Sequence, residues 1–196
     1  MERKPKPKKC KECKVEFTPW VSTQLVCSPK CGIEYARKKE KKKREKENRA
    51  AAKELRRKSL KWQHEQTQKA FNKLRVLQEK QWFKERGLEP TCISCGKENM
   101  DWCCGHFKTR GAQPELRYDP KNTFLQCNRY CNMALSGNIE GNKNTRGYKQ
   151  GLLERFGDEG QEILDYLESP HDIKKWAWEE LEEFRAEINK QIRELT

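Results

Sequence analysis

The 196-residue sequence lacks any long hydrophobic run. No apolar stretch approaches the roughly 20 residues that a membrane-spanning helix needs. The N-terminal MERKPKPKK also lacks the apolar centre and the small-residue cleavage site of a secretory signal. We therefore expect no membrane partner and a cytoplasmic location. In such a reducing compartment, spaced cysteine pairs indicate metal sites more often than disulfides.

Hydrophobic side chains are scarce as well. They make up 34% of the chain against 37% charged residues, and the mean hydropathy is −1.19. Such a composition does not supply one large core, so we expect small, stapled domains and solvated helices. The formal net charge of +13 predicts attraction to polyanions, of which nucleic acid is the commonest.

Four segments differ in composition: 1–36, 37–88, 89–146 and 147–196. Glycine and proline are absent from the second until Gly87, which predicts a long helix ending at Gly87 and Pro90. From Arg37 to Lys58 it carries thirteen Lys or Arg and four Glu, a net charge of +9, with almost no apolar side chain. This half is either a lone basic helix or a segment disordered until it meets a polyanion.

Two later stretches have an apolar stripe at helical spacing. The first follows Leu60, and we expect it to dock onto the next domain. The second follows the breaks at Gly157 and Ser169-Pro170, and it either packs on the core or forms a homodimer that suits a two-fold substrate. The stripes comprise Ala70, Phe71, Leu74, Leu77 and Trp82, and then Leu181, Phe184, Ile188, Ile192 and Leu195.

Eight of the ten cysteines form two sets of close pairs. Each set supplies four thiolates, the arrangement of a structural Zn²⁺ site that is closed to substrate. In modules this small, zinc binding contributes about 10 kcal/mol of folding free energy. The first set is Cys10, Cys13, Cys27 and Cys31, and the second is Cys92, Cys95, Cys127 and Cys131.

Histidine is rare, with three in the chain. His64 lies in a charged predicted helix and His171 at a turn, so both are expected on the surface. His106 follows a glycine inside the second cysteine loop. An asparagine on either side of the last cysteine pair, Asn122 and Asn132, completes the pattern Cys-x2-Cys, Gly-His, Asn, Cys-x3-Cys-Asn.

This pattern resembles the HNH (ββα-metal) endonucleases, and the match is closer still to the lambda NinG (Rap) family of phage recombination proteins. The resemblance implies a mostly helical α+β chain with a zinc-stapled ββα-metal core, an N-terminal four-cysteine zinc module, a long basic helix and C-terminal amphipathic helices. The motifs that carry it are Cys-Ser-Pro-Lys-Cys-Gly at 27–32, Cys-Ile-Ser-Cys-Gly at 92–96, Gly-His at 105–106, Leu-Arg at 116–117, Gln-Cys at 126–127 and Ser-Gly-Asn at 136–138.

The resemblance implies a phage-encoded, structure-specific DNA endonuclease that cuts Holliday junctions or D-loops. His106 would be the general base, Asn122 would orient its strand, and Asn132 with one further side chain would hold Mg²⁺ or Mn²⁺. Arg117 and Lys121 would clamp the phosphate oxygens, unless Arg117 is paired with a nearby carboxylate.

One position departs from the family pattern. Related phage nucleases have an aspartate three residues before the histidine, where this chain has Cys103. A thiolate prefers Zn²⁺ to Mg²⁺. Cys103 therefore ligates a thiophilic ion, or Asp101 reaches in from the same face of the strand, or the active site is weakened or dead.

Two alternatives to an endonuclease follow. The first is a non-catalytic, zinc-bound, DNA-binding recombination mediator with the same fold. The second, weaker alternative is an RNA-binding protein or a transcription factor, although no base-reading helix stands out.

Overall fold

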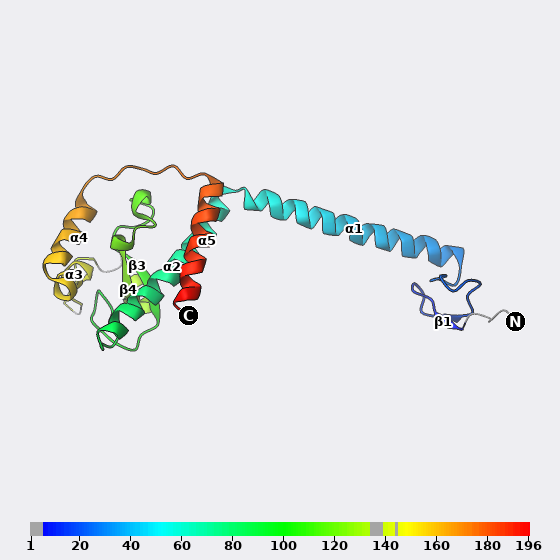
Figure 1. Cartoon of the computed structure of the whole chain (residues 1–196), viewed down its shortest axis with the longest axis horizontal. Coiled ribbons are helices and arrows are strands. Elements are labelled where there is room, and N and C mark those ends of the chain that lie inside the picture. Colours follow the sequence, from blue (N-terminus) through cyan, green and yellow to red (C-terminus); the bar gives the residue numbers. More distant parts are fainter. Residues whose placement is uncertain (1–5, 134–138, 144) are drawn as a thin grey trace. The chain divides into compact units, whose positions relative to one another are not determined.

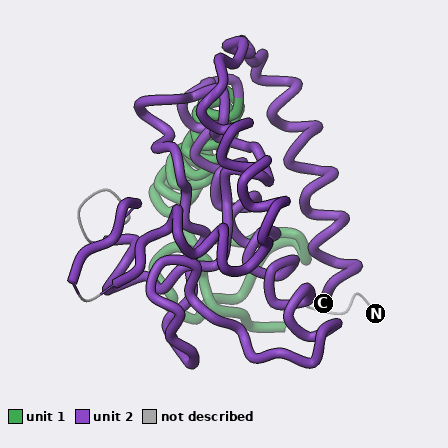
Figure 2. Tube along the Cα trace, turned by 90° about the vertical axis from the view of Figure 1, so that its left-hand side faces the viewer, with its two compact units in different colours: residues 1–57 green, residues 58–196 purple. Residues whose placement is uncertain are grey.

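The computed structural model describes residues 6–133, 139–143 and 145–196. The chain divides into two compact units, residues 1–57 and 58–196 (Figure 2), so the boundary falls inside the predicted segment 37–88. The predicted mostly helical α+β composition is confirmed, with two small two-stranded sheets. None of the described helices combines the length and the apolar composition that a membrane span needs.

The first unit consists of a small cysteine module and one long helix. Strand β1 (Lys8–Lys9) pairs antiparallel with β2 (Glu16–Phe17), and helix α1 (Pro29–Arg57) follows (Figure 1). Proline suits the first turn of a helix because its ring fixes φ there, and α1 accordingly begins eight residues before the predicted start at residue 37. No residue of α1 is buried. The structure thus has the lone basic helix rather than the disordered alternative.

The predicted helix 37–88 is two helices, with a break at Lys58 and Ser59. Ser59 has an extended backbone, and its hydroxyl accepts a hydrogen bond from the backbone N–H of Trp62 at 3.5 Å. This N-cap starts a new helix, α2 (Leu60–Glu85). The predicted end is confirmed, since Gly87 follows α2 with a φ of 64°.

The centre of the second unit is a hairpin of β3 (Trp102–His106) and β4 (Thr123–Cys127). Its register places His106 opposite Thr123 at one end and Trp102 opposite Cys127 at the other. Two short turns, η1 (Pro114–Leu116) and η2 (Pro120–Asn122), lie in the connection, and a single π-helical turn, η3 (Asn128–Asn132), follows β4.

Helices cover both sides of this hairpin. Figure 1 shows α2 on one side, and α3 (Tyr148–Phe156) and α4 (Asp158–Glu168) on the other. All five residues of β4 are therefore buried. The Tyr148 hydroxyl from α3 donates to Gly105 O and accepts from Phe124 N, each at 2.9 Å, and so joins the two strands. The core on this side consists of Ile93, Phe107, Leu116, Phe124, Tyr148, Leu152, Ile163, Leu164 and Leu167.

The last helix, α5 (Trp178–Glu194), packs on α2. Phe71 and Leu74 of α2 meet Ile188 and Ile192 of α5 in one apolar cluster. Most of the two predicted stripes thus cover each other, so α5 packs on α2 rather than on the hairpin, while Trp82 and Leu195 lie outside this cluster. A homodimer stays a prediction and needs another surface.

Two strands of the expected ββα core are present. The segment that follows η3, residues 134–138 with the Ser-Gly-Asn motif at 136–138, lies outside the described residues. The HNH-like core therefore stays a prediction.

Candidate metal centres and nucleic-acid interface

The first cysteine set forms a cluster that can hold zinc. The sulfur atoms of Cys10, Cys13, Cys27 and Cys31 all lie within 4.8 Å of one another. The Sγ–Sγ distances are 3.5 Å for Cys13–Cys27 and 3.7 Å for Cys27–Cys31. A tetrahedral Zn²⁺ with Zn–S bonds of about 2.3 Å separates its sulfurs by about 3.8 Å, and all ten cysteines of the chain are free of disulfides.

The second set forms a similar but more buried cluster. Its ligand atoms also lie within 4.8 Å of one another, and the Cys95 and Cys127 sulfurs are 3.8 Å apart. The Gly96 N–H donates to Cys92 O at 2.8 Å with a φ of 70°, which closes the first Cys-x2-Cys turn. Burial raises the pKa of the Cys92 thiol, but N–H donors, led by that of Cys127, outweigh burial and lower it. They thus favour the thiolate that zinc binds.

His106 is a half-buried, uncharged imidazole at the far end of β3. Desolvation lowers its pKa to about 4, so the ring is neutral at pH 7. Its Nε2 lies 3.3 Å from Arg117 O and 3.5 Å from Gln68 Nε2 of α2. The ring therefore has one nitrogen without a proton, but a pKa this far below 7 makes it a weak general base.

Asn122 fixes the turn that follows His106. Its side chain is fully buried, and its Oδ1 accepts from Lys108 N at 2.7 Å. Its Nδ2 donates to Lys108 O and to Leu116 O, each at 3.0 Å. The Asn122 backbone carbonyl also accepts from Phe107 N at 2.9 Å. This one side chain thus ties the loop that follows β3 to the end of η1.

The other predicted site residues lie at the opposite, cysteine end of the hairpin. Asn132 follows Cys131 in η3, and its amide donates to Asn128 Oδ1 at 3.5 Å, while Asn128 Nδ2 donates to Asp101 Oδ2 at 3.4 Å. Four strand positions, about 13 Å at 3.3 Å per residue, separate His106 from this end of the hairpin.

Cys103 also lies away from His106. Strand side chains alternate, so Cys103 and His106 point to opposite faces of β3. The Cys103 thiol donates to Gln126 O at 3.3 Å, and burial raises its pKa to about 12. Among the described residues, the two cysteine sets are the only clusters of three or more His, Cys, Asp or Glu ligands.

Arg117 and Lys121, the two residues predicted to bind phosphate oxygens, have different surroundings. Nε of Arg117 is buried without a hydrogen-bond partner among the described atoms. Lys121 is exposed, with its ammonium 4.7 Å above the Tyr166 ring. The carboxylate of Asp119 accepts from the Tyr166 hydroxyl at 2.6 Å and from Lys121 N at 2.8 Å.

The prediction that His64 and His171 are exposed is wrong. His64 Nδ1 lies 2.9 Å from the Tyr118 hydroxyl, and burial lowers the pKa of this histidine. His171 Nε2 lies 2.9 Å from Tyr166 O, and its ring packs edge-on against the Tyr166 ring. Both are half-buried. The partner of His64 is distant in sequence, and the partner of His171 lies across the turn.

Sequence reasoning missed the polar side chains of α2 that hold the hairpin. Arg75 donates to Thr123 Oγ1 at 3.0 Å and to Thr123 O at 2.8 Å, directly opposite His106. Glu79 accepts from Arg75, from Arg155 and from Leu125 N. The only sequence signal was the presence of polar residues on an apolar helix face.

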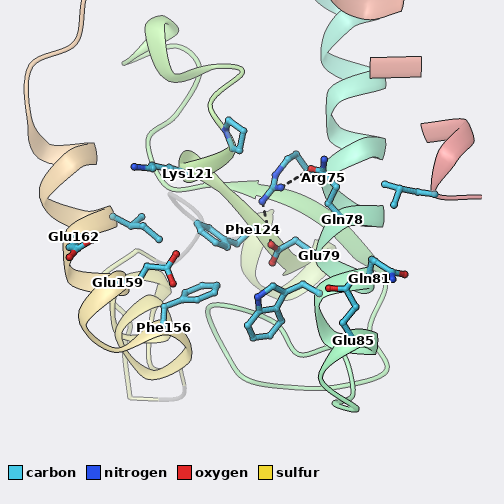
Figure 3. A pocket seen from close by; sticks show the side chains of 14 residues that line it. Arg75, Gln78, Glu79, Gln81, Glu85, Lys121, Phe124, Phe156, Glu159 and Glu162 are labelled. Carbon is cyan, nitrogen blue, oxygen red and sulfur yellow. Dashed lines mark hydrogen bonds and ion pairs between the residues drawn. The ribbon is translucent and has the colours of Figure 1, made fainter. Parts of the chain in front are cut away.

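A cleft of about 490 Å³ lies between α2, β4, α3 and α4 (Figure 3). Trp82, Phe124 and Phe156 line it, together with Glu159 and Glu162 of α4. Of the predicted site residues, the cleft contains Lys121 alone. The cleft thus adds nothing to the predicted chemistry at His106.

The positive charge of the protein is concentrated in the first unit. Residues 1–57 contain 20 of the 43 Lys and Arg but only 8 of the 30 Asp and Glu, a net charge of +12. Residues 58–196 have a net charge of +1. The electrostatic attraction to a polyanion therefore belongs to the cysteine module and α1.

The comparisons with known proteins agree on one family. A family model described as "Bacteriophage Lambda NinG protein" matches residues 2–196. Protein ninG of Escherichia phage lambda is 33% identical over 100% of this chain and 96% of its own length. Protein ninG of Enterobacteria phage H19B is 35% identical over 98% and 95%, and that of Salmonella phage P22 is 32% identical over 96% and 93%. No solved structure matches the chain.

Proposed function

We propose that this chain, which belongs to the NinG family of lambda-like phages, binds branched DNA during phage recombination and holds zinc in both cysteine sets. The observation that carries this proposal is helix α1, which presents thirteen Lys or Arg and buries no residue. A helix with this charge and no apolar face has no protein core to join, so its function is to contact a polyanion.

The dimensions of α1 suit a DNA backbone. Its 29 residues span about 43 Å at 1.5 Å per residue. Duplex DNA carries one negative charge per roughly 1.7 Å of its axis, so several phosphates lie within reach of one helix face. Contacts of this kind depend on the phosphate backbone and its charge rather than on the base sequence.

Endonuclease activity on the same DNA is the second candidate function. One observation favours it: the buried Asn122 side chain fixes the loop that follows His106. In this candidate function, His106 accepts a proton from the attacking water. Asn122 acts through the loop and holds the imidazole in place.

The described residues do not fit a Mg²⁺ or Mn²⁺ ion beside His106. These ions prefer several oxygen ligands, whereas the hydrogen-bond partners of His106 Nε2 are one main-chain carbonyl and one amide nitrogen. Asn132 and Cys103 lie elsewhere on the hairpin, and the Cys103 thiol is a soft ligand. No catalytic step through such an ion follows from this geometry, and the disagreement favours the non-catalytic mediator over the nuclease.

Binding is tested by removing charge from α1 in the full-length, zinc-loaded protein. Changing four basic residues to glutamine leaves helix propensity almost unchanged. The affinity for a four-way junction should fall, and the log–log salt slope should become shallower by up to about 0.9 for each phosphate that the variant no longer binds. The substitutions are Lys41→Gln, Lys42→Gln, Lys43→Gln and Arg44→Gln.

A matched control removes the same charge from exposed helical positions of the second unit. It should keep the wild-type salt slope to within about 0.9, the value of one phosphate. Equal loss in the two variants would show that net charge alone, and not α1, attracts the DNA. The control substitutions are Lys61→Gln, Lys80→Gln, Lys84→Gln and Lys190→Gln.

Cleavage is tested separately, with a labelled junction and Mg²⁺, Mn²⁺ or Zn²⁺. Cutting by the wild type that His106→Gln abolishes without loss of binding would support the nuclease. Binding without cutting in every metal would support the mediator. Because Cys103 and His106 point to opposite faces of β3, Cys103→Asp should not restore Mg²⁺-dependent cutting. Cutting by this variant would contradict the placement of Cys103 away from His106.

A further inference from the structure

The first cysteine module carries an exposed tryptophan that no fold requirement explains. Trp20 lies in the loop between Cys13 and Cys27, and it is 91% exposed. The other five tryptophans of the chain are at least half-buried. An exposed aromatic ring is a candidate contact for another molecule, because burying it is favourable.

The loop that carries Trp20 is held firmly. Pro19 before it is buried, and the Trp20 N–H donates to Gln24 Oε1 at 2.8 Å. Gln24 Nε2 donates to Val26 O at 2.9 Å, and the Lys8 ammonium donates to Ser22 O at 2.7 Å. The indole is therefore presented by a preorganised backbone, so little further ordering is needed when a ligand binds.

The cysteine module that carries Trp20 is basic, which favours an anionic ligand. Residues 6–31 contain six lysines and two glutamates. One of the two, Glu12, is already paired with Lys38 of α1. The lysines are Lys6, Lys8, Lys9, Lys11, Lys14 and Lys30. A flat aromatic face among cations is the combination that binds a nucleobase together with its phosphates.

We propose that Trp20 stacks on an unpaired base of the DNA and so gives the protein a preference for sites where base pairing is interrupted. This inference rests on the proposed DNA binding and adds the feature that α1 does not supply. Phosphate contacts are alike in a plain duplex and in a branched molecule, whereas an unstacked base is present only where pairing is interrupted. The cysteine module thus recognises the interruption, and α1 holds the adjoining backbone.

The test compares two DNA molecules that differ only in unpaired bases. One is a duplex of about 30 base pairs, long enough for α1 at roughly 3.4 Å per base pair, and the other is the same duplex with a bulge of thymines. The wild type should bind the bulged DNA at least about fivefold more tightly, as stacking of one base predicts. Its tryptophan fluorescence should be quenched by the bulge, and the quenching should be absent from Trp20→Ala.

The variants separate stacking from general surface loss. Trp20→Ala should lose the preference while its affinity for the plain duplex stays within about twofold, since the phosphate contacts are unchanged, and Trp20→Phe should keep most of it. Val21→Ala, an exposed apolar neighbour in the same loop, should behave as the wild type. Native mass spectrometry should give two zinc ions per chain for all four proteins, which excludes unfolding as the cause.

The inference and the proposed function fail in different ways. If Trp20→Ala keeps the preference, or weakens both complexes by the same factor, then Trp20 does not read unpaired bases. If the wild type binds both DNA molecules with a steep salt dependence but no preference, the stacking inference alone is overturned. If the wild type binds neither, the proposed DNA binding itself is wrong.

Discussion

Glu79 is the charged group on which the second unit should depend most. Its side chain is 8% exposed and lies between Arg75, 12% exposed, and Arg155, 6% exposed. Its oxygens are 3.3 Å from Arg75 and 3.1 Å from Arg155, and one of them accepts from Leu125 N of β4 at 3.1 Å. One carboxylate thus joins α2, β4 and α3.

Glu79→Gln keeps the shape of the side chain but removes its charge. Two buried guanidinium groups then lose their anionic partner, and breaking a buried ion pair costs about 3–5 kcal/mol. Burial lowers the pKa of Arg155, and the Glu79 carboxylate opposes this effect. For a unit of this size, a loss of about 3–5 kcal/mol lowers the melting temperature by about 10–17 °C.

The assay is urea unfolding of the zinc-loaded chain, followed by circular dichroism. Glu85→Gln, an exposed glutamate on the same helix, is the matched control and should change stability by less than about 0.5 kcal/mol. If Glu79→Gln is as stable as Glu85→Gln, then the buried triad does not hold the hairpin.

Three further changes have defined outcomes. Cys127→Ser should lower the zinc content from two ions per chain to one in native mass spectrometry, whereas Cys103→Ser should keep both ions. Loss of zinc from Cys103→Ser would contradict the assignment of the zinc ligands. Asn122→Ala leaves buried partners of its side chain unpaired and should cost about 2–4 kcal/mol in urea unfolding, and a cost below about 1 kcal/mol would refute its function in holding the loop. The pKa of His106 is lowered to about 4, so between that pH and about 6.5 the unfolded chain binds the extra proton. Stability should therefore fall by up to about 3 kcal/mol as the pH falls from about 6.5 to about 4. The wild-type loss should exceed that of His106→Gln, and equal losses would show that His106 does not titrate in this way.

The cysteine clusters and the helices were predictable from the sequence because their determinants are local. A Cys-x2-Cys or Cys-x3-Cys pair lies on one turn, so its spacing fixes which sulfurs can share an ion. The start of α2 depends on the cap at Ser59, and a single serine among charged residues is a weak signal in a sequence. The sequence therefore predicts one continuous helix over 37–88 where the structure has two.

The arrangement around His106 could not be predicted, because it depends on strand register and on contacts between distant segments. His106 and Asn132 belong to the same cysteine loop pattern in the sequence. In the fold they lie at opposite ends of the hairpin, because His106 pairs with Thr123. The bonds from Gln68, Arg75 and Tyr148 join segments separated by 38, 48 and 43 positions. Periodicity identifies the helix face but not its polar partners across the fold.

The most direct test of the proposed function is the binding of the zinc-loaded wild-type chain to a four-way junction, measured over a series of salt concentrations. We expect saturable binding whose affinity falls linearly on a log–log plot, with a slope of several units that reflects several phosphate contacts, and we expect the junction to be preferred over a duplex of equal length. A flat salt response, or no saturable binding at low salt, would contradict the assignment of α1 as a DNA-binding helix.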